Sequence, residues 1–329
     1  MATDLVPGVA PETPPSTRPP ADPPPGKWAT RLARIGRNRW LYLMLLPGLA
    51  YFALFRYWPM YGLSIAFQDY LPFLGYEGSP WVGLKHFEAL FTGPDFARVM
   101  INTFLLALVT LIFVFPAPIV VALLLNELRH NVVKRSVQSL IYIPYFLSWT
   151  IVASLTYLLF SVDYGVLAEL IHDFVGGRKV DYVAQEAWFR PIIVIQQLWK
   201  LTGWGTIIYL AALANVDTQL YEAAQVDGAG RWRQFWHITL PAIRPAIVVM
   251  TILASGNLLD TGFEQIWLMT TSLNRSVAEV FDTYVYLVGI TQGSFSYSTA
   301  VGLFKGVLGV ILIFGSNWLA KRLGERGLY

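Results

Sequence analysis

The 329-residue sequence is 55% hydrophobic and 14% charged, a composition too apolar for a soluble domain of this size and typical of a polytopic membrane protein. It contains no cysteine, which excludes disulfides, thiolate metal sites and cysteine nucleophiles. The net charge of +3 is carried by basic residues beside apolar segments, so we interpret these residues as topology signals and expect no nucleic-acid partner.

The N-terminal segment has the composition of an unfolded chain. Residues 1–26 hold nine of the 20 prolines and show no apolar periodicity, so we expect a disordered tail. Residues 27–39 carry five basic side chains, with Trp28, Leu32 and Ile35 on one face, which predicts a short helix lying on an anionic membrane surface. A signal peptide is the competing interpretation, but the polar preface is long and no small-residue cleavage site follows.

Residues 40–329 contain six apolar segments, each close to the roughly 20 residues that cross a bilayer. An even number of spans puts both termini on one side of the membrane. Lys and Arg are in excess at the termini and in the loops after spans two and four, which predicts that these parts are cytoplasmic. The predicted fold is an all-α, six-span membrane domain with spans at Trp40–Tyr57, Phe96–Leu125, Leu140–Phe160, Pro191–Ala214, Ala246–Met269 and Tyr297–Leu319.

Between spans four and five, the polar segment 216–245 predicts a cytoplasmic helix-turn-helix. Asp217 is placed to cap the first helix, and Gly228 breaks it after an apolar stripe at helical spacing. A second helix begins at Arg231. We expect it to end at Pro241, because a proline ring does not fit in a helix interior.

The same segment carries a spaced motif: E-A-A, three residues, G, nine residues, then I-x-L-P. This motif resembles the coupling loop of ABC importer permeases, which docks on the ATPase subunit in that family. The chemistry fits, because small alanines allow close approach of a partner and a glutamate offers a carboxylate to an arginine. The resemblance assigns the docking role to Glu222, Ala223, Ala224, Asp227, Gly228, Ile238, Leu240 and Pro241.

Stretches outside this loop are similar to the permeases of carbohydrate importers, and more narrowly to those for polysaccharide or oligosaccharide fragments such as alginate and pectin fragments. The resemblance covers residues 37–329. The stretches are W-P-M-Y-G from Trp58, S-P-W-V-G-L from Ser79, L-L-N-E from Leu124, F-L-S-W from Phe146, G-F-E-Q from Gly262 and Y-S-T-A-V-G-L-F-K from Tyr297.

The resemblance implies a multi-pass subunit of the bacterial cell (inner) membrane that works in a complex. Its partners would be a second permease subunit in a heterodimer, two ATPase subunits, an extracytoplasmic solute-binding protein and an oligosaccharide substrate. ATP and Mg would be bound by the partner ATPase, and no cofactor by this chain. The sequence supports this division independently, because it has no G-x-x-x-x-G-K-[ST] phosphate loop, so we expect no enzyme activity here.

Polar residues within the predicted spans are the candidates for the substrate pathway, since an ionisable group in hydrocarbon is costly unless it faces a cavity or a partner. Asp260 and Glu264 are four residues apart, so we expect them to share one helical face. Trp204 and Phe263 are candidates to stack on a sugar ring. The remaining candidates are Gln196, Gln197 and Lys200 in span four, Asn257 and Gln265 in span five, and Lys305 in span six.

Two interpretations of these polar residues stay open. In one, amides and carboxylates hydrogen-bond sugar hydroxyls. In the other, Lys200 and Lys305 neutralise Asp260 and Glu264 inside the helix bundle.

Three other functions compete with that of an importer permease. A non-transporting membrane anchor for an ATPase would keep the coupling loop, and a secondary transporter would also need polar spans. An intramembrane enzyme would need a catalytic motif within the spans, and the sequence has neither G-x-S-x-G nor H-E-x-x-H.

Overall fold

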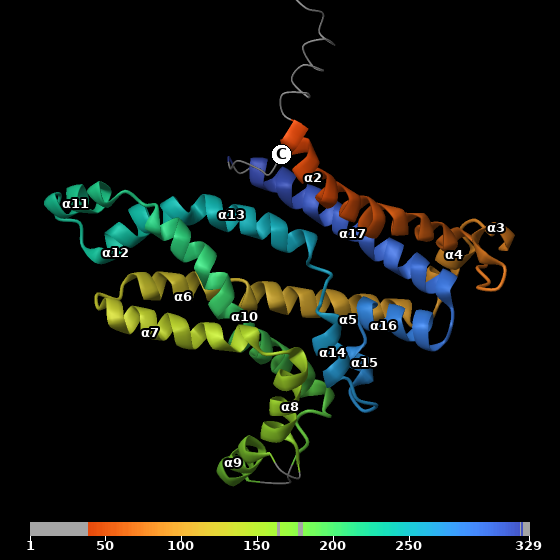
Figure 1. Ribbon diagram of the computed structural model, residues 1–329. Coiled ribbons are helices and arrows are strands. Elements are labelled where there is room, and N and C mark those ends of the chain that lie inside the picture. Colours follow the sequence, from red (N-terminus) through yellow and green to blue (C-terminus); the bar gives the residue numbers. More distant parts are fainter. Residues whose placement is uncertain (1–38, 163–164, 177–179, 323, 325–329) are drawn as a thin grey trace, which may run out of the picture. The chain divides into compact units, whose positions relative to one another are not determined.

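The computed structural model describes residues 39–162, 165–176, 180–322 and 324, and Figure 1 shows that this part of the chain is built from helices. Its only β-bridge in these ranges joins Gln68 and Trp81. The all-α prediction is confirmed. The predicted tail (1–26) and almost all of the basic helix (27–39) lie outside the described residues. The chain divides into two units after Tyr61.

The described part of the first unit is a single helical run. α2 (Arg39–Phe52) continues through a π-helical turn, η1 (Ala53–Tyr57), into the 3₁₀-helix η2 (Trp58–Phe67), which extends into the second unit. The run of 29 residues is apolar, and none of its most apolar window is buried within the protein. An apolar helical run of this length is the form that a membrane span takes in lipid.

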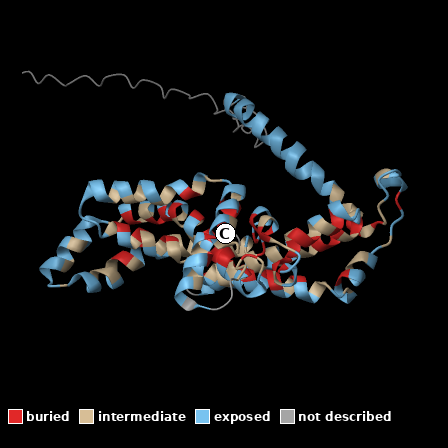
Figure 2. Cartoon of the chain, turned by 90° about the horizontal axis from the view of Figure 1, so that it is seen from below, coloured by how far each residue is buried: buried red, intermediate tan, exposed pale blue. Residues whose placement is uncertain are grey.

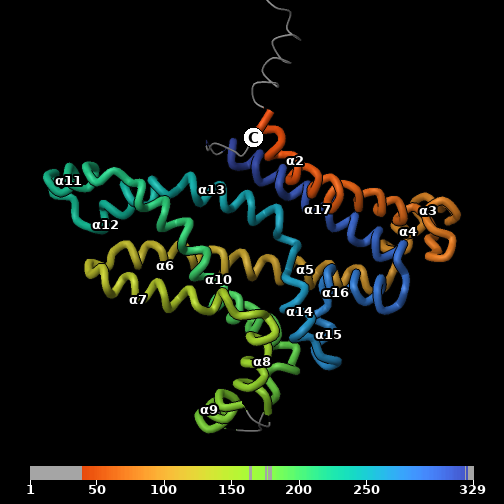
Figure 3. Tube along the Cα trace, in the orientation of Figure 1, coloured from red at the N-terminus to blue at the C-terminus, as the bar shows by residue number. Residues whose placement is uncertain are grey.

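The second unit holds the remaining helices, which Figure 3 traces from α3 to α17. Their order is α3 (Gly75–Gly78), α4 (Lys85–Thr92), α5 (Phe96–Val109), η3 (Thr110–Val114), α6 (Ala117–Asn126), α7 (Asn131–Tyr142), η4 (Ile143–Phe146), α8 (Trp149–Phe160), α9 (Val166–Val175), α10 (Glu186–Ala214), α11 (Thr218–Val226), α12 (Arg231–Gln234), η5 (Phe235–Thr239), α13 (Leu240–Gly256), α14 (Phe263–Met269), α15 (Arg275–Ala278), α16 (Phe281–Tyr286), η6 (Leu287–Thr291) and α17 (Phe295–Arg322).

Among the described residues, four helical runs are long and apolar enough to cross a membrane, and a bent pair adds a fifth. α10 has 29 residues and so a length of about 44 Å, which is enough to cross, but its central glutamines and lysine make it less apolar. A helix therefore occupies each of the six predicted regions. The four runs are Arg39–Phe67, Phe96–Asn126, Arg231–Gly256 and Phe295–Arg322.

The third predicted span is not a straight helix. The segment from Asn131 to Phe146 meets α8 at 98°, so a continuous span over Leu140–Phe160 is wrong. Pro144 lies in the 3₁₀ turn η4, and Ser148 starts α8 afresh by accepting a hydrogen bond from the amide of Ile151. A new N-cap so soon after a proline gives the chain a sharp corner.

The fifth predicted span is also interrupted. α13 ends at Gly256 and α14 begins at Phe263, so the single span predicted over Ala246–Met269 is wrong. Gly262 has φ +85°, a left-handed conformation that a side chain resists. We name residues 257–262 the span-five break.

The second helix of the hairpin at 216–245 was predicted to end at Pro241, but it continues into α13. The π-helical turn η5 precedes the proline, and the amide of Leu240 bonds five residues back to Phe235. The hydrogen bonds of the π turn reach one residue further than those of an α-helix, which makes room for the ring of Pro241, so the helix continues past this proline. Pro245 also lies inside α13.

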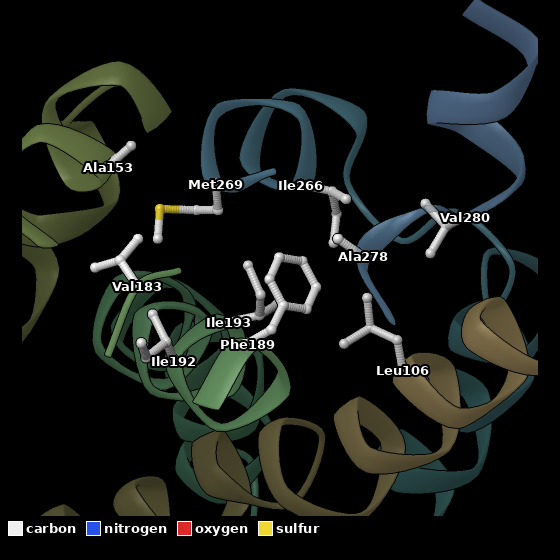
Figure 4. Packing of buried hydrophobic residues seen from close by; sticks show 10 residues of the cluster. All are labelled: Leu106, Ala153, Val183, Phe189, Ile192, Ile193, Ile266, Met269, Ala278 and Val280. Carbon is white, nitrogen blue, oxygen red and sulfur yellow. The ribbon is translucent and has the colours of Figure 1, made fainter. Parts of the chain in front are cut away.

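The interior of the second unit is a set of apolar clusters between these helices. Figure 2 shows the buried residues concentrated along the inner sides of the helices, with much of the outer surface exposed. Figure 4 shows the cluster where α5, α8, α10 and α14 meet. It contains Leu106, Ala153, Val183, Phe189, Ile192, Ile193, Ile266, Met269, Ala278 and Val280.

Candidate functional site

The coupling hairpin, defined as residues 216–245, follows α10 in the chain, and its helices α11 and α12 lie at the end of the unit where α6 turns into α7 (Figure 1). Asp217 caps α11 as predicted, because its carboxylate accepts a hydrogen bond of 2.9 Å from the amide of Gln219. Gly228 has φ +74° and turns the chain between α11 and α12. The predicted helix-turn-helix is confirmed.

Two hydrogen bonds brace the hairpin. The hydroxyls of Tyr221 and Thr239 lie 2.9 Å apart and join α11 to η5, and Gln234 donates to the carbonyl of Ala229 across the turn. Within this braced hairpin Glu222, Ala223, Asp227, Gly228 and Pro241 are exposed, whereas Ala224, Ile238 and Leu240 are half-buried. The hairpin thus holds a carboxylate and small side chains on an accessible surface.

A cavity of about 430 Å³ lies between α5, α6, η4, α10 and α13. Its volume is within the roughly 300–1,000 Å³ of small-molecule sites. Among its lining residues, the rings of Tyr145 and Trp204 stack in parallel with centroids 4.5 Å apart. Gln197, Asn257 and Asp260 add an amide, a second amide and a carboxylate, so four of the predicted pathway residues share this cavity.

Thr261 adds a free polar group to the cavity wall. Its side chain is 7% exposed, and its hydroxyl has no hydrogen-bond partner within the described ranges. A buried hydroxyl without a partner costs free energy unless a ligand or water satisfies it. Thr261, which lies within the span-five break, therefore keeps a buried hydroxyl without a hydrogen-bond partner at the cavity wall.

The three predicted glutamines form a buried cross-link rather than three separate wall residues. Gln265 of α14 donates to the side-chain oxygen of Gln196 over 2.8 Å and accepts from the amide of Gln197 over 3.0 Å. Gln196 also donates to Thr156 of α8, and Gln197 accepts from Thr110. These bonds fasten α14 to α10, and Gln197 is the one that also lines the cavity.

Lys200 has a different environment from the one expected. Its ammonium donates to the backbone carbonyls of Tyr145, at 2.8 Å, and Leu147, and lies over the ring of Trp149 at 5.3 Å. It thereby satisfies carbonyls at the corner between η4 and α8. Among the described residues no ion pair joins Lys200 to Asp260 or Glu264, and Glu264 is exposed in the first turn of α14.

Lys305 is the intramembrane lysine that does pair with carboxylates. From α17 it contacts Asp260 of the span-five break and Asp282 of α16. Because Asp260 lies in the break and not in a helix, it does not share a helical face with Glu264, and that prediction is wrong. The structure thus shows a contact between Lys305 and Asp260, and both interpretations of these residues, substrate binding and charge neutralisation, stay predictions.

Phe263 and Glu264 lie outside the cavity wall. Phe263 stacks against Trp267 with centroids 5.8 Å apart, so the stacking partner of this aromatic is another protein ring. Sequence reasoning missed Tyr145 and Thr261, which do line the cavity. Tyr145 lies in the turn after Pro144, and it contacts Trp204 only once the chain has folded. No local sequence pattern marks Thr261 as a cavity residue.

The long apolar helices and the cavity between them are those of a polytopic membrane protein. Residues 114–325 match the family of binding-protein-dependent transport system inner membrane components, and the chain belongs to this family. It is a permease subunit of an ABC importer, as the sequence motifs indicated.

Curated relatives agree with this assignment over nearly the whole chain. Protein LplB of Bacillus subtilis (strain 168) is 56% identical over 304 residues, covering 92% of this chain and 95% of the relative. The polygalacturonan/rhamnogalacturonan transport system permease protein YteP of the same organism is 56% identical over 298 residues, covering 91% and 92%.

A solved structure shares the fold. A chain of a bacterial ABC transporter involved in the import of the acidic polysaccharide alginate superposes with a TM-score of 0.82 at 36% identity, covering 89% of this chain and 99% of that one. The same kind of transporter in complex with an alginate pentasaccharide-bound periplasmic protein gives a TM-score of 0.83 at 36% identity, with 90% and 99% covered.

Proposed function

We propose that this permease moves an oligosaccharide or polysaccharide fragment into the cytoplasm. The cavity supports a sugar, because it combines stacked aromatic rings with amide, carboxylate and hydroxyl groups. The relatives named above transport polygalacturonan or rhamnogalacturonan, and alginate. Their substrates are polymers of sugar units, the class that such a cavity suits.

The observation that carries the coupling assignment is the braced hairpin with an exposed Glu222 ahead of the Gly228 turn. We assign this surface to docking of a partner ATPase, with Glu222 as acceptor for a basic group of that partner. The partner would bind ATP and Mg and supply the energy of transport by hydrolysis. The basic residues flanking the spans support cytoplasmic termini and a cytoplasmic hairpin in the bacterial cell membrane.

The full assembly would contain a second permease, two ATPase subunits and an extracytoplasmic binding protein that delivers the sugar. A solved neighbour bound to a periplasmic protein supports the last of these. Transport would proceed by alternating access, with the hairpin transmitting ATPase closure to the helices around the cavity. This chain contributes binding groups and rigid helices, and its role is to hold and release the sugar.

The experiment compares Glu222→Lys with Glu88→Lys, the same change at an exposed position of α4. Each variant is purified in mild detergent from the native membrane, and sugar uptake and sugar-stimulated ATP hydrolysis are measured in proteoliposomes. We expect Glu222→Lys to insert normally, to lose most uptake and to co-purify with less ATPase, whereas Glu88→Lys keeps all three. Wild-type uptake by Glu222→Lys would refute the docking role.

A further inference from the structure

Lys305 holds two carboxylates, and they are not equivalent. The side chain of Asp282 is 23% exposed and lies in the first turn of α16, whereas that of Asp260 is 63% exposed and lies in the non-helical span-five break. Lys305 itself is 15% exposed. Asp282 is therefore the fixed partner of the lysine, and Asp260 is the partner that can leave at low cost.

The surroundings give Asp260 a second place to go. A groove of about 590 Å³ beside α17 contains Lys305, Asn257 and Asp260, and the sugar cavity also contains Asn257 and Asp260. Asp260 thus lies on the rim between the groove and the cavity. Rotation of this one side chain exposes the ammonium of Lys305 without breaking any helix.

We propose that Lys305 recognises a carboxylate of the transported sugar and that Asp260 occupies this position while the pathway is empty. The inference rests on the proposed sugar transport and names the substrate class as an acidic oligosaccharide. An incoming carboxylate replaces that of Asp260 at the ammonium, so Lys305 keeps two carboxylate partners throughout.

This exchange explains why a lysine in the pathway needs two acidic partners. Asp282 stays beside the ammonium in both states, so the second position, which Asp260 occupies in the empty pathway, is the one that a substrate carboxylate takes over. The other intramembrane lysine is unsuited to the task, because Lys200 is already bonded to two backbone carbonyls at the η4–α8 corner.

The test measures uptake of trigalacturonate and of its fully methyl-esterified form by the complete complex in proteoliposomes. All variants use the same binding protein, so a change in preference between variants comes from the permease. We expect Lys305→Gln to lower the preference for the acid over the ester about tenfold or more, the factor that a charge-assisted hydrogen bond contributes. Lys321→Gln, the same change at an exposed position of α17, serves as control and keeps the preference.

Whereas Lys305→Gln should weaken the preference for the acidic sugar, Asp260→Asn should strengthen it. Loss of the competing carboxylate lowers the half-saturating concentration of trigalacturonate severalfold and leaves that of the ester unchanged. A purely structural ion pair predicts instead that Asp260→Asn and Lys305→Gln reduce uptake of both sugars equally, and this result would overturn the proposal. Absence of uptake of either sugar by the wild-type complex would contradict the proposed sugar transport itself.

Discussion

Replacing Gly203 by alanine tests the closest helix crossing around the cavity. An added Cβ at Gly203 of α10 would lie 2.0 Å from the carbonyl oxygen and 2.6 Å from the carbonyl carbon of Ile141 in α7. Both obstructing atoms are backbone, so no side chain can turn away. α7 and α10 would have to move apart, and the stacked rings of Tyr145 and Trp204 would move apart with them.

The expected cost follows from two opposing effects. Overpacking a rigid site costs about 1–3 kcal/mol, and a backbone clash belongs at the upper end of that range. Alanine recovers about 1 kcal/mol over glycine in a helix interior. The net destabilisation is about 2 kcal/mol, or roughly a thirtyfold fall in the folded-to-unfolded ratio.

The matched control is Gly315→Ala in α17, where an added Cβ meets no atom within 4 Å. Thermal unfolding in detergent, followed by tryptophan fluorescence, is measured for both variants. We expect Gly203→Ala to unfold at a lower temperature than wild type, and Gly315→Ala to be unchanged or slightly more stable. Equal stability of the two variants would refute the close crossing of α7 and α10.

Three further predictions concern the hairpin, the corner between η4 and α8, and the loop before α4. Gly228→Val forces a branched side chain to φ +74°, which costs about 1–2 kcal/mol locally, so we expect sugar-stimulated ATP hydrolysis to fall. Gly230→Val is the control: Gly230 has φ −66°, which valine adopts freely, so ATP hydrolysis should be unchanged. Lys200→Met leaves the carbonyls of Tyr145 and Leu147 without a hydrogen bond, which destabilises the folded protein by about 1–3 kcal/mol for each carbonyl. The variant should therefore unfold at a lower temperature than wild type, and an unchanged unfolding temperature would contradict these hydrogen bonds. In the loop before α4, the hydrogen bond from Lys85 holds the pKa of Asp69 below its usual value. The ionised Asp69 therefore stabilises the folded loop at any pH above its unfolded pKa of about 3.9, and this stabilisation is lost as the pH falls through the lower pKa of the folded state. Protease sensitivity of this loop should therefore rise in acid for the wild type and be high but pH-independent in Asp69→Asn; identical profiles would exclude the ion pair as the cause.

Local signals in the sequence were sufficient for the coupling hairpin. A capping aspartate, a helical stripe and a glycine at a turn act through neighbouring backbone atoms, so Asp217 and Gly228 could be assigned correctly before any folding was considered. The end of the second helix could not be predicted in this way. The π turn before Pro241 is formed by backbone hydrogen bonds between residues five apart, one more than in an α-helix, and no local sequence signal marks such a turn.

The cavity depended on contacts that no local pattern records. Lys200 finds its partners in backbone carbonyls more than fifty residues away, and a backbone carbonyl leaves no mark in a sequence. Polarity alone grouped Gln196 with Gln197, yet the fold bonds both to Gln265 and places only Gln197 in the wall of the cavity as well. Composition identifies candidates, and only packing decides between a binding group and a structural one.

The span-five break separates a helix that continues from the hairpin from a helix that is fastened to α10. α13 extends from the hairpin at Leu240 to Gly256, about 26 Å, and ends beside the cavity. Beyond the break, Gln265 fastens α14 to α10 through the buried glutamines. We infer that α13 transmits hairpin movement and that the break absorbs it before α14. Spin labels on α13 and α14 should therefore change their separation when ATP is added to the complex, whereas labels on α10 and α14 should not; movement of α14 with α13 as one rigid body would exclude this role of the break.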